Sequence, residues 1–324
     1  MGKNYIYKIS CENRKILFFS YTGISIRTSG IAKNTGENFL KFSDLISNVP
    51  QFDLFNQSTI LDAQGMVIGY STVAIDKAGI AIGGGIHSLL ETSQRIALAE
   101  SLERSIFNKI CDDVKLKKDF YIEEYPTTCG FAAGFEDEKT KLRAVCEAIE
   151  RWAWSKWIDE GFSISKSERP EILSPITQNF IKNFDNVLFY KKQFEITFED
   201  KILPLTWGVL LGIKGGGIFP GSRVCGINED PWEHSSVEAW RHFHMFNSSK
   251  IAPYKKNFYL DRVLHFATKL DLALASIPKN NFKTWPVPKI DFCKKFEGIT
   301  FSLWRALSFD YIGWEKGNID RFIY

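Results

Sequence analysis

The pattern of apolar and polar positions predicts strands and helices that alternate along most of the chain. Two short β-rich runs, 5–9 and 16–19, flank polar residues and predict a hairpin near the amino terminus. Val, Ile, Tyr and Ala alternate with Gly and Asp over 65–82, which predicts buried strands that close on a tight loop at Gly83–Gly85. A helix is expected next, because apolar residues recur every three or four positions from Ala99 to Ile110, and Thr92 or Ser93 is its predicted amino-terminal cap.

This layout recurs further along the chain. A glycine-containing turn at 128–134 precedes a helix predicted from about Glu138 to Trp157. The buried stripe of that helix is predicted to contain Leu142, Val145, Ile149 and Trp152. Residues 203–209 and 215–217 resemble a strand and a loop, before a third helix predicted from Ser235 to Phe246. Prolines then interrupt the pattern between 278 and 289, and 299–307 is predicted to be a strand.

Composition and charge limit the class of protein. A chain of 324 residues with 44% apolar residues can bury a large core. The balance of 41 basic against 38 acidic side chains indicates neither a nucleic-acid nor a membrane-surface partner. No low-complexity linker divides the chain. We therefore expect one domain of mixed α+β class over 1–324, with an amino-terminal hairpin region (1–64), a core (65–246) and a carboxy-terminal part (247–324).

Cysteine usage and hydropathy predict a cytoplasmic protein. No pair of cysteines has C-x-x-C spacing, so they are expected to be free thiols in a reducing compartment. No run is apolar and long enough for a signal peptide or a membrane span. The six cysteines are Cys11, Cys111, Cys129, Cys146, Cys225 and Cys293.

The most informative feature is a duplicated pentapeptide, Glu100-Ser101-Leu102-Glu103-Arg104 and Glu147-Ala148-Ile149-Glu150-Arg151. Each copy puts two carboxylates on one helical face, and four would converge if the helices pack side by side. Oxygen clusters of this kind suit Mg²⁺ together with nucleotide phosphates. The alternative is an ordinary i,i+4 surface ion pair in each helix, worth about 0.3–0.5 kcal/mol. Duplication argues against that alternative, since the motif follows Gly85 by 15 residues and Gly134 by 13.

The segment Gly130-Phe131-Ala132-Ala133-Gly134 with the second pentapeptide resembles the central signature of YcaO proteins, and 97–104 resembles the earlier one. The resemblance implies a mixed α/β fold that binds ATP and Mg²⁺ and activates backbone amides of a ribosomally made precursor peptide, which gives azolines, thioamides or amidines. It implies that Glu100, Glu103, Glu147 and Glu150 hold metal, and that Arg104 and Arg151 orient carboxylates or contact phosphates. An E1-like or leader-binding partner and a homodimer are further expectations.

Three positions depart from the pattern of that family. Ile96 stands where a Ser is usual, and Thr140 and Arg143 stand where an Asn and a Glu are usual. Arg143 shares a helical face with Glu147 and Glu150, so it would project a positive charge toward those carboxylates or toward a phosphate. The preferred interpretation is an ATP-dependent, cyclodehydratase-like enzyme. The alternative is a non-catalytic subunit or scaffold of a peptide-modifying complex that keeps the fold without conventional ATP binding.

The third helix supplies weaker candidates. Arg223 and Arg241 are candidate phosphate contacts, although surface arginines need no such role. Zinc is not expected at His242 and His244, because their i,i+2 spacing points them to different helical faces. The tryptophans of the second helix are expected in core or subunit packing, with stacking on adenine or a peptide as the alternative for an exposed one. They are Trp152, Trp154 and Trp157.

Overall fold

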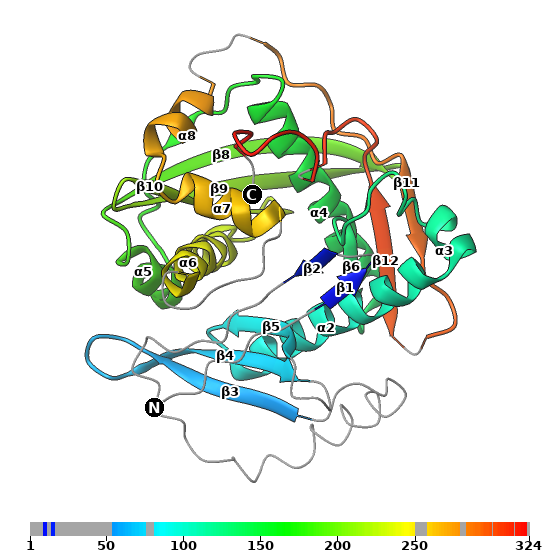
Figure 1. Ribbon diagram of the computed structural model, residues 1–324, viewed down its shortest axis with the longest axis horizontal. Coiled ribbons are helices and arrows are strands. Elements are labelled where there is room, and N and C mark those ends of the chain that lie inside the picture. Colours follow the sequence, from blue (N-terminus) through cyan, green and yellow to red (C-terminus); the bar gives the residue numbers. More distant parts are fainter. Residues whose placement is uncertain are drawn as a thin grey trace. The chain divides into compact units, whose positions relative to one another are not determined.

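The structure is a computed structural model that describes residues 9–11, 14–16, 54–75, 81–249, 258–278, 283–299, 301–313 and 315–322 (Figure 1). These residues divide into two compact units, and the chain passes between them several times. Unit 1 takes its residues from Met1–Glu123, Ala132–Thr140 and Lys295–Trp304. Unit 2 takes its residues from Glu124–Phe131, Lys141–Lys294 and Arg305–Tyr324. The single domain over 1–324 stays a prediction.

Unit 1 is built on an antiparallel sheet with strand order β3-β4-β5. Its strands are β3 (Leu54–Leu61), β4 (Val67–Ile75) and β5 (Ala81–His87). Helix α2 (Leu90–Asp112) packs on β4 and β5, and the short α3 (Val114–Asp119) follows it (Figure 1). A hairpin is present as predicted, with β1 (Ile9–Cys11) paired with β2 (Arg14–Ile16), but Arg14 and Lys15 lie in a strand and not in the connection. Its predicted residues 5–8 and 17–19 lie outside the described residues.

The predicted glycine loop before α2 is wrong, because Gly83–Gly85 lie inside strand β5. A Cβ atom at Gly83 would lie 2.3 Å from the carbonyl oxygen of Ala97, and one at Gly85 would lie 2.0 Å from that of Ser93. Glycine is therefore needed to let α2 lie against the strand backbone.

The predicted cap of α2 is also wrong. Thr92 and Ser93 lie inside the helix, and the cap position is Leu89, which makes no side-chain capping bond. Ser93 is fully buried; it donates its hydroxyl to the carbonyl oxygen of Gly85 at 3.0 Å, and its Oγ lies 2.8 Å from Thr72 Oγ1, within hydrogen-bond distance. Its hydroxyl therefore links α2 to strands β4 and β5.

Unit 2 is built on a second antiparallel sheet, with strand order β10-β9-β8-β7. Its strands are β7 (Lys166–Ser167), β8 (Asn186–Phe198), β9 (Lys201–Lys214) and β10 (Gly217–Gly226). Its main helices are α4 (Asp137–Ile158), whose first four residues belong to unit 1, and α6 (Trp232–Ser249). Smaller helices are α5 (Pro175–Ile181), α7 (Phe258–Phe266) and α8 (Leu270–Ser276). A third sheet has the strand order β11 (Phe292–Lys295), β12 (Ser302–Leu307) and β6 (Phe131–Gly134). The boundary between the units falls within each of these strands.

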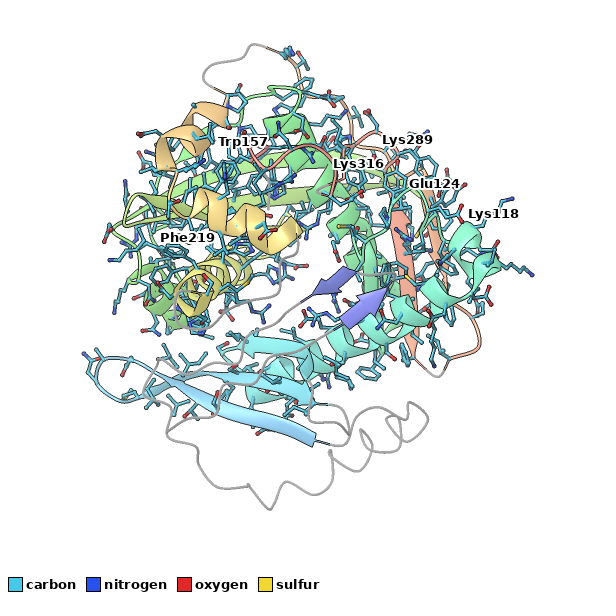
Figure 2. All side chains as sticks on the ribbon, viewed as in Figure 1. Lys118, Glu124, Trp157, Phe219, Lys289 and Lys316 are labelled. Atoms are coloured by element: carbon cyan, nitrogen blue, oxygen red, sulfur yellow. The ribbon has the colours of Figure 1, made fainter. Side chains whose placement is uncertain are left out.

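Aromatic side chains fill both faces of the unit 2 sheet. On the α4 face, Trp157 packs edge-on against Trp207, with ring centroids 5.7 Å apart. On the α6 face, Phe219 packs against Phe184 and Phe243 (Figure 2 labels Trp157 and Phe219). The prediction that the α4 tryptophans serve packing is confirmed for the core, since Trp152, Trp154 and Trp157 are at most 2% exposed.

The other predicted elements are largely confirmed. α4, α6, β9 and β12 contain the predicted ranges or most of them, and Gly215 and Gly216 form the turn between β9 and β10 with positive φ. The predicted turn at 128–134 is wrong in its second half, which is strand β6. The cysteines Cys111, Cys129, Cys146, Cys225 and Cys293 are free thiols as predicted. Within the described part of the chain, no helix has both the length and the apolar character needed to span a membrane.

Candidate functional site

The first glutamate motif lies on α2 beside β5, the edge strand of its described sheet. Glu100 Oε2 accepts the backbone N–H of Gly84 at 2.6 Å, and Glu100 Oε1 pairs with Arg104 Nη2. Arg104 Nη1 in turn donates to the carbonyl oxygen of Ile82 at 3.0 Å. Because an edge strand exposes unpaired backbone groups, this Glu-Arg pair satisfies both a donor and an acceptor of β5.

Glu103 plays a similar part at another edge strand. Its Oε1 accepts the backbone N–H of Ala133 at 2.8 Å. Ala133 lies in β6, which is the edge of the sheet β11-β12-β6. Both carboxylates of the first motif thus bind strand backbone within unit 1. They differ from the Glu91–Arg95 pair earlier on α2, whose side chains are more than half exposed.

In unit 2, Glu150 is the most enclosed of the predicted metal ligands, with 8% of its side chain exposed. Its Oε1 accepts the hydroxyl of Ser222 at 2.8 Å, and its Oε2 accepts the N–H of Val224 at 3.0 Å. Trp154 Nε1 donates to the same Ser222 hydroxyl at 2.8 Å. Ser222 and Val224 belong to β10, another edge strand, so α4 is joined to that edge through one buried carboxylate.

Arg151 is the cation beside this carboxylate, with its Nη1 3.7 Å from Glu150 Oε1. Burial lowers the pKa of Arg151, but the charges of Glu150, Glu147 and Glu238 outweigh burial and raise it above its usual value. Arg151 is therefore a fixed positive charge among carboxylates. Glu147 is half-buried, one helical turn before Arg151 on α4.

The sequence reasoning missed Glu238 of α6. Its Oε2 accepts the N–H of Ser222 at 2.8 Å, so it binds the same edge strand as Glu150. Burial, followed by the charge of Glu150, raises the pKa of Glu238 to about 7. The signal in the sequence is its place three residues before Arg241, which repeats the spacing of Glu147 and Glu150 with an arginine in the second position.

Unit 2 brings together four of the five arginines predicted to contact the cofactor. The pKa of His234 lies well below its usual value. Loss of hydration next to neighbouring protein atoms is the first cause and four nearby positive charges are the second, although the residue is exposed at the surface. These charges belong to Arg223, Arg241, Arg143 and Arg151. The fifth predicted arginine, Arg104, belongs to unit 1.

The four predicted metal ligands are divided between the units, Glu100 and Glu103 in unit 1 and Glu147 and Glu150 in unit 2. Their convergence on one metal therefore stays a prediction. Over the residues that the structure describes, no three His, Cys, Asp or Glu side chains form a group that could hold a metal ion.

The three departures from the family pattern have different surroundings. Thr140 is buried against β6, where it donates its hydroxyl to the carbonyl oxygen of Glu136 at 2.7 Å. A Cβ atom at Gly134 would lie 2.4 Å from Thr140 Oγ1, so this threonine sets how closely α4 approaches the strand. Ile96 is half-buried on α2, and Arg143 is exposed.

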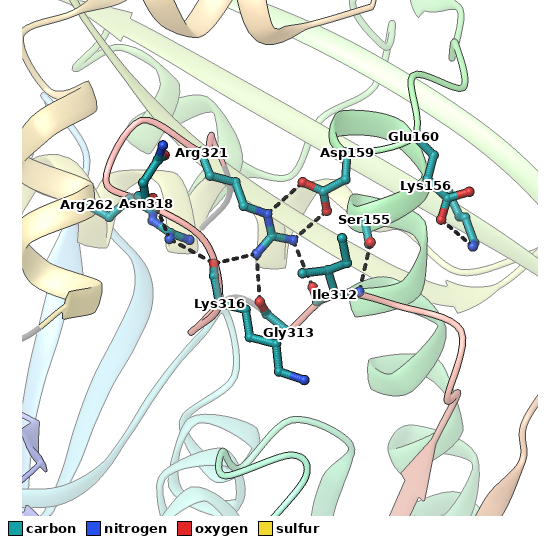
Figure 3. Close-up of polar contacts among 10 residues, drawn as sticks. All are labelled: Ser155, Lys156, Asp159, Glu160, Arg262, Ile312, Gly313, Lys316, Asn318 and Arg321. Atoms are coloured by element: carbon teal, nitrogen blue, oxygen red, sulfur yellow. Dashed lines mark hydrogen bonds and ion pairs between the residues drawn. The ribbon is translucent and has the colours of Figure 1, made fainter.

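The carboxy-terminal half of α4 is held by the last described residues, as Figure 3 shows. Arg321 makes two bonds to the carboxylate of Asp159, which lies just after α4. The same guanidinium donates to the carbonyl oxygens of Ile312, Gly313 and Lys316 at 2.6–3.0 Å. We call this group the carboxy-terminal clasp. It anchors the helix that carries the second glutamate motif.

Comparison with known proteins identifies the fold. No protein-family model matches the sequence, and no curated protein matches it. The structure is similar to that of YcaO from Methanopyrus kandleri bound with AMPPCP and Mg²⁺, with a TM-score of 0.53 and 10% sequence identity, over 83% of this chain and 88% of that chain. The chain has a YcaO-like fold. The predicted mixed α/β class is confirmed, with small antiparallel sheets flanked by helices. At 10% identity the likeness concerns the fold.

Proposed function

We propose that this chain binds ATP with Mg²⁺ and activates a backbone amide of a ribosomally synthesised precursor peptide. The observation that carries the proposal is the grouping in unit 2 of four arginines with the carboxylates of Glu150 and Glu238, on a YcaO-like fold. The similar Methanopyrus kandleri structure holds AMPPCP and Mg²⁺, which supports the choice of ligand.

The chemistry of the side chains fits such a ligand. Guanidinium groups bind phosphate oxygens in a bidentate manner, and carboxylate oxygens are preferred ligands of Mg²⁺. Arg151, Arg223, Arg241 and Arg143 would contact phosphates, and Glu147 and Glu150 would hold the cation. Glu100, Glu103 and Arg104 of unit 1 are proposed for the same roles. Because the bonds to Ser222 and Val224 fix Glu150, its remaining lone pairs would meet a cation without reorganisation.

When bound, ATP supplies the phosphoryl group that makes the amide oxygen a leaving group. A thiol or hydroxyl of the peptide adds to the amide carbon, and the amide oxygen departs with the transferred phosphoryl group as inorganic phosphate. The products are an azoline, ADP and phosphate, and the peptide has lost one water in total. The residues of this chain position and neutralise charge, which is the main demand of phosphoryl transfer.

A second candidate is a non-catalytic subunit of a peptide-modifying complex. The observation that favours it is that Glu100, Glu103 and Glu150 each accept a strand backbone N–H, so they have a structural role whether or not ATP binds. The exposed Arg143 in place of the usual glutamate also favours it.

Calorimetry with AMPPCP and Mg²⁺ on the full chain separates the two candidates. The proposed enzyme binds with micromolar affinity, and Glu147→Gln removes the binding because a metal ligand is lost. Glu91→Gln, in an exposed ion pair on α2, serves as the matched control and binds like the wild type. No binding by the wild-type chain would favour the non-catalytic subunit.

The reaction itself is tested by mass spectrometry of a candidate precursor peptide incubated with ATP and Mg²⁺, with and without a leader-binding partner. Loss of one water from the peptide is the expected outcome when a thiol or hydroxyl of the peptide is the nucleophile, and exchange of oxygen for sulfur is expected when sulfide is added as the nucleophile. Nucleotide binding without any change in peptide mass, in the presence of a partner and a peptide that the chain binds, would contradict the catalytic proposal.

A further inference from the structure

A cavity of about 360 Å³ opens in unit 2 where β7 ends beside β8. β8 is paired with β9 along its whole length, but β7 pairs with β8 at only two positions, opposite Phe189 and Tyr190. Over the residues that the structure describes, the rest of β8 therefore has a strand on one side only. The cavity is lined by Lys166, Ser167, Glu168, Arg169, Val187 and Phe189.

The backbone of β8 is open to this cavity at Val187. The register of β7 would place Arg169 opposite Val187, but the strand stops at Ser167. The N–H of Val187 donates instead to the side-chain Oδ1 of Asn186 at 2.8 Å. Alternate residues of an antiparallel strand turn their backbone groups to opposite sides, and Val187 faces the side on which Phe189 meets Ser167. A local side-chain bond thus takes the place of a strand partner.

The floor of the cavity is apolar. Phe189 is 3% exposed and packs edge-on against Trp232, with ring centroids 5.2 Å apart. Val187 lies two positions away on the same face of the sheet and packs against the same core cluster. Ser167 contributes a buried hydroxyl that makes no hydrogen bond with any described residue. The cavity therefore offers an apolar surface and an unused polar group.

The rim of the cavity carries two exposed cations, Lys166 and Arg169, and one exposed carboxylate, Glu168. None of the three forms an ion pair with another residue in the described part of the chain. This distinguishes them from Lys214 at the same end of β8, which lies 2.5 Å from Asp185. The lining has one net positive charge, and its cations have no acidic partner within unit 2. An acidic ligand would supply that partner.

We propose that this cavity docks an extended peptide segment in which apolar and acidic side chains alternate, and that the segment adds as a strand beside Val187. The inference deepens the proposed function and rests on it for the natural source of the segment, the precursor peptide. In strand addition, main-chain hydrogen bonds supply affinity, and pockets for alternate side chains supply specificity. Apolar side chains would meet Val187 and Phe189, and carboxylates would pair with Lys166 or Arg169.

The test is fluorescence anisotropy of the full chain with a fluorescein-labelled octapeptide of alternating leucine and glutamate. The matched probe has lysine in place of every glutamate. The wild-type chain binds the glutamate probe more tightly than the lysine probe. Lys166→Glu and Arg169→Glu each weaken binding of the glutamate probe by about threefold to tenfold, because an attractive charge becomes repulsive, whereas Glu168→Gln strengthens it.

Lys201→Glu is the control for this change of charge. Lys201 is exposed in the turn-proximal part of β9, at the other end of the β8–β9 hairpin and roughly 35 Å from Val187 along the strand. Its substitution leaves the affinity for the glutamate probe unchanged.

Asn186→Ala separates strand addition from simple attraction between charges. It alters no charge, but it removes the acceptor that competes with the peptide for the N–H of Val187. The affinity for the glutamate probe therefore rises, by about threefold or more. Wild-type or weaker affinity in this variant shows that the peptide does not add to β8, and it overturns the inference.

Three further results overturn the inference: no binding of the glutamate probe, equal binding of the lysine probe, or wild-type affinity in both Lys166→Glu and Arg169→Glu. A change of oligomeric state in Arg169→Glu, without probe binding by the wild type, would assign the cavity to a second copy of the chain and also overturn it. Binding of AMPPCP with Mg²⁺ but not of the glutamate probe defeats the inference alone. Probe binding without affinity for AMPPCP defeats the proposed ATP site and leaves the peptide site.

Discussion

Removal of the Glu150 carboxylate is expected to destabilise unit 2 strongly. Glu150→Ala deletes the acceptor of two hydrogen bonds, from the hydroxyl of Ser222 and the N–H of Val224, and removes the carboxylate that lies 3.7 Å from Arg151 Nη1. Bonds to a charged acceptor are each worth about 1.5–3 kcal/mol, and removing one partner of a buried ion pair costs about 3–5 kcal/mol. Because these effects overlap, we expect a loss of about 3–5 kcal/mol in the free energy of unfolding.

Glu150→Gln separates shape from charge at the same position. Its amide oxygen can still accept the Val224 N–H, while its amide NH₂ faces a Ser222 hydroxyl that already accepts from Trp154. The expected loss is about 1–2 kcal/mol, less than half of that for alanine. Glu91→Gln, which breaks an exposed pair with Arg95, is expected to change the free energy by about 0.5 kcal/mol or less.

Urea unfolding followed by tryptophan fluorescence measures these differences, because Trp154 donates directly to Ser222 and lies in the aromatic core of unit 2. The urea concentration at the unfolding midpoint should be highest for Glu91→Gln, lower for Glu150→Gln and lowest for Glu150→Ala. If Glu150→Ala unfolds at the same urea concentration as Glu91→Gln, the buried carboxylate does not hold α4 to β10 and the reasoning is refuted.

Two other predictions concern a buried histidine and the carboxy-terminal clasp. Burial, with the charges of Arg241 and Arg151, lowers the pKa of His242 to about 4, below the 6.5 of an exposed histidine, so the unfolded chain binds its proton at a higher pH than the folded chain does. Stability is therefore lost as pH falls from 6.5 toward 4, by up to about 3 kcal/mol, and His242→Gln should flatten this part of the curve; parallel pH profiles for both proteins would contradict it. Arg321→Gln should lower the free energy of unfolding by about 2–4 kcal/mol, because the guanidinium binds Asp159 and three backbone carbonyls. A double-mutant cycle with Asp159→Asn should give a coupling energy of about 1 kcal/mol or more, and additive effects would speak against the clasp.

The repeated strand-and-helix layout was predictable because it depends on local periodicity. Apolar spacing placed α2, α4 and α6, and the two glutamate motifs located the helices that meet strand edges. The role of Gly83–Gly85 was not predictable from local rules. A glycine run usually indicates a loop, and only the approach of α2 to within contact of the backbone explains why these glycines lie in a strand.

The candidate site was predictable in part for a similar reason. The motif identified glutamates and arginines by type and spacing, and four of the arginines lie close enough to His234 of unit 2 to lower its pKa. Glu238 was missed because its neighbour Arg241 breaks the Glu-x-x-Glu pattern, although its own contact with β10 follows the rule of Glu100. The second motif position is a carboxylate in Glu103 and a guanidinium in Arg241, whereas Glu100 and Glu238 at the first position both bind strand backbone.

The bonds between glutamates and edge strands give the motif a structural role, which affects how mutations in it are interpreted. An edge strand with unpaired backbone groups can pair with another chain, so loss of such a glutamate favours aggregation. A chain of this fold that bound no nucleotide would still need Glu100 and Glu150, because each accepts a backbone N–H of an edge strand, β5 or β10. The presence of Glu-x-x-Glu-Arg in this fold therefore reflects what the sheet edges require. A change of activity would be visible first at positions where the charge changes, such as 241 and 143.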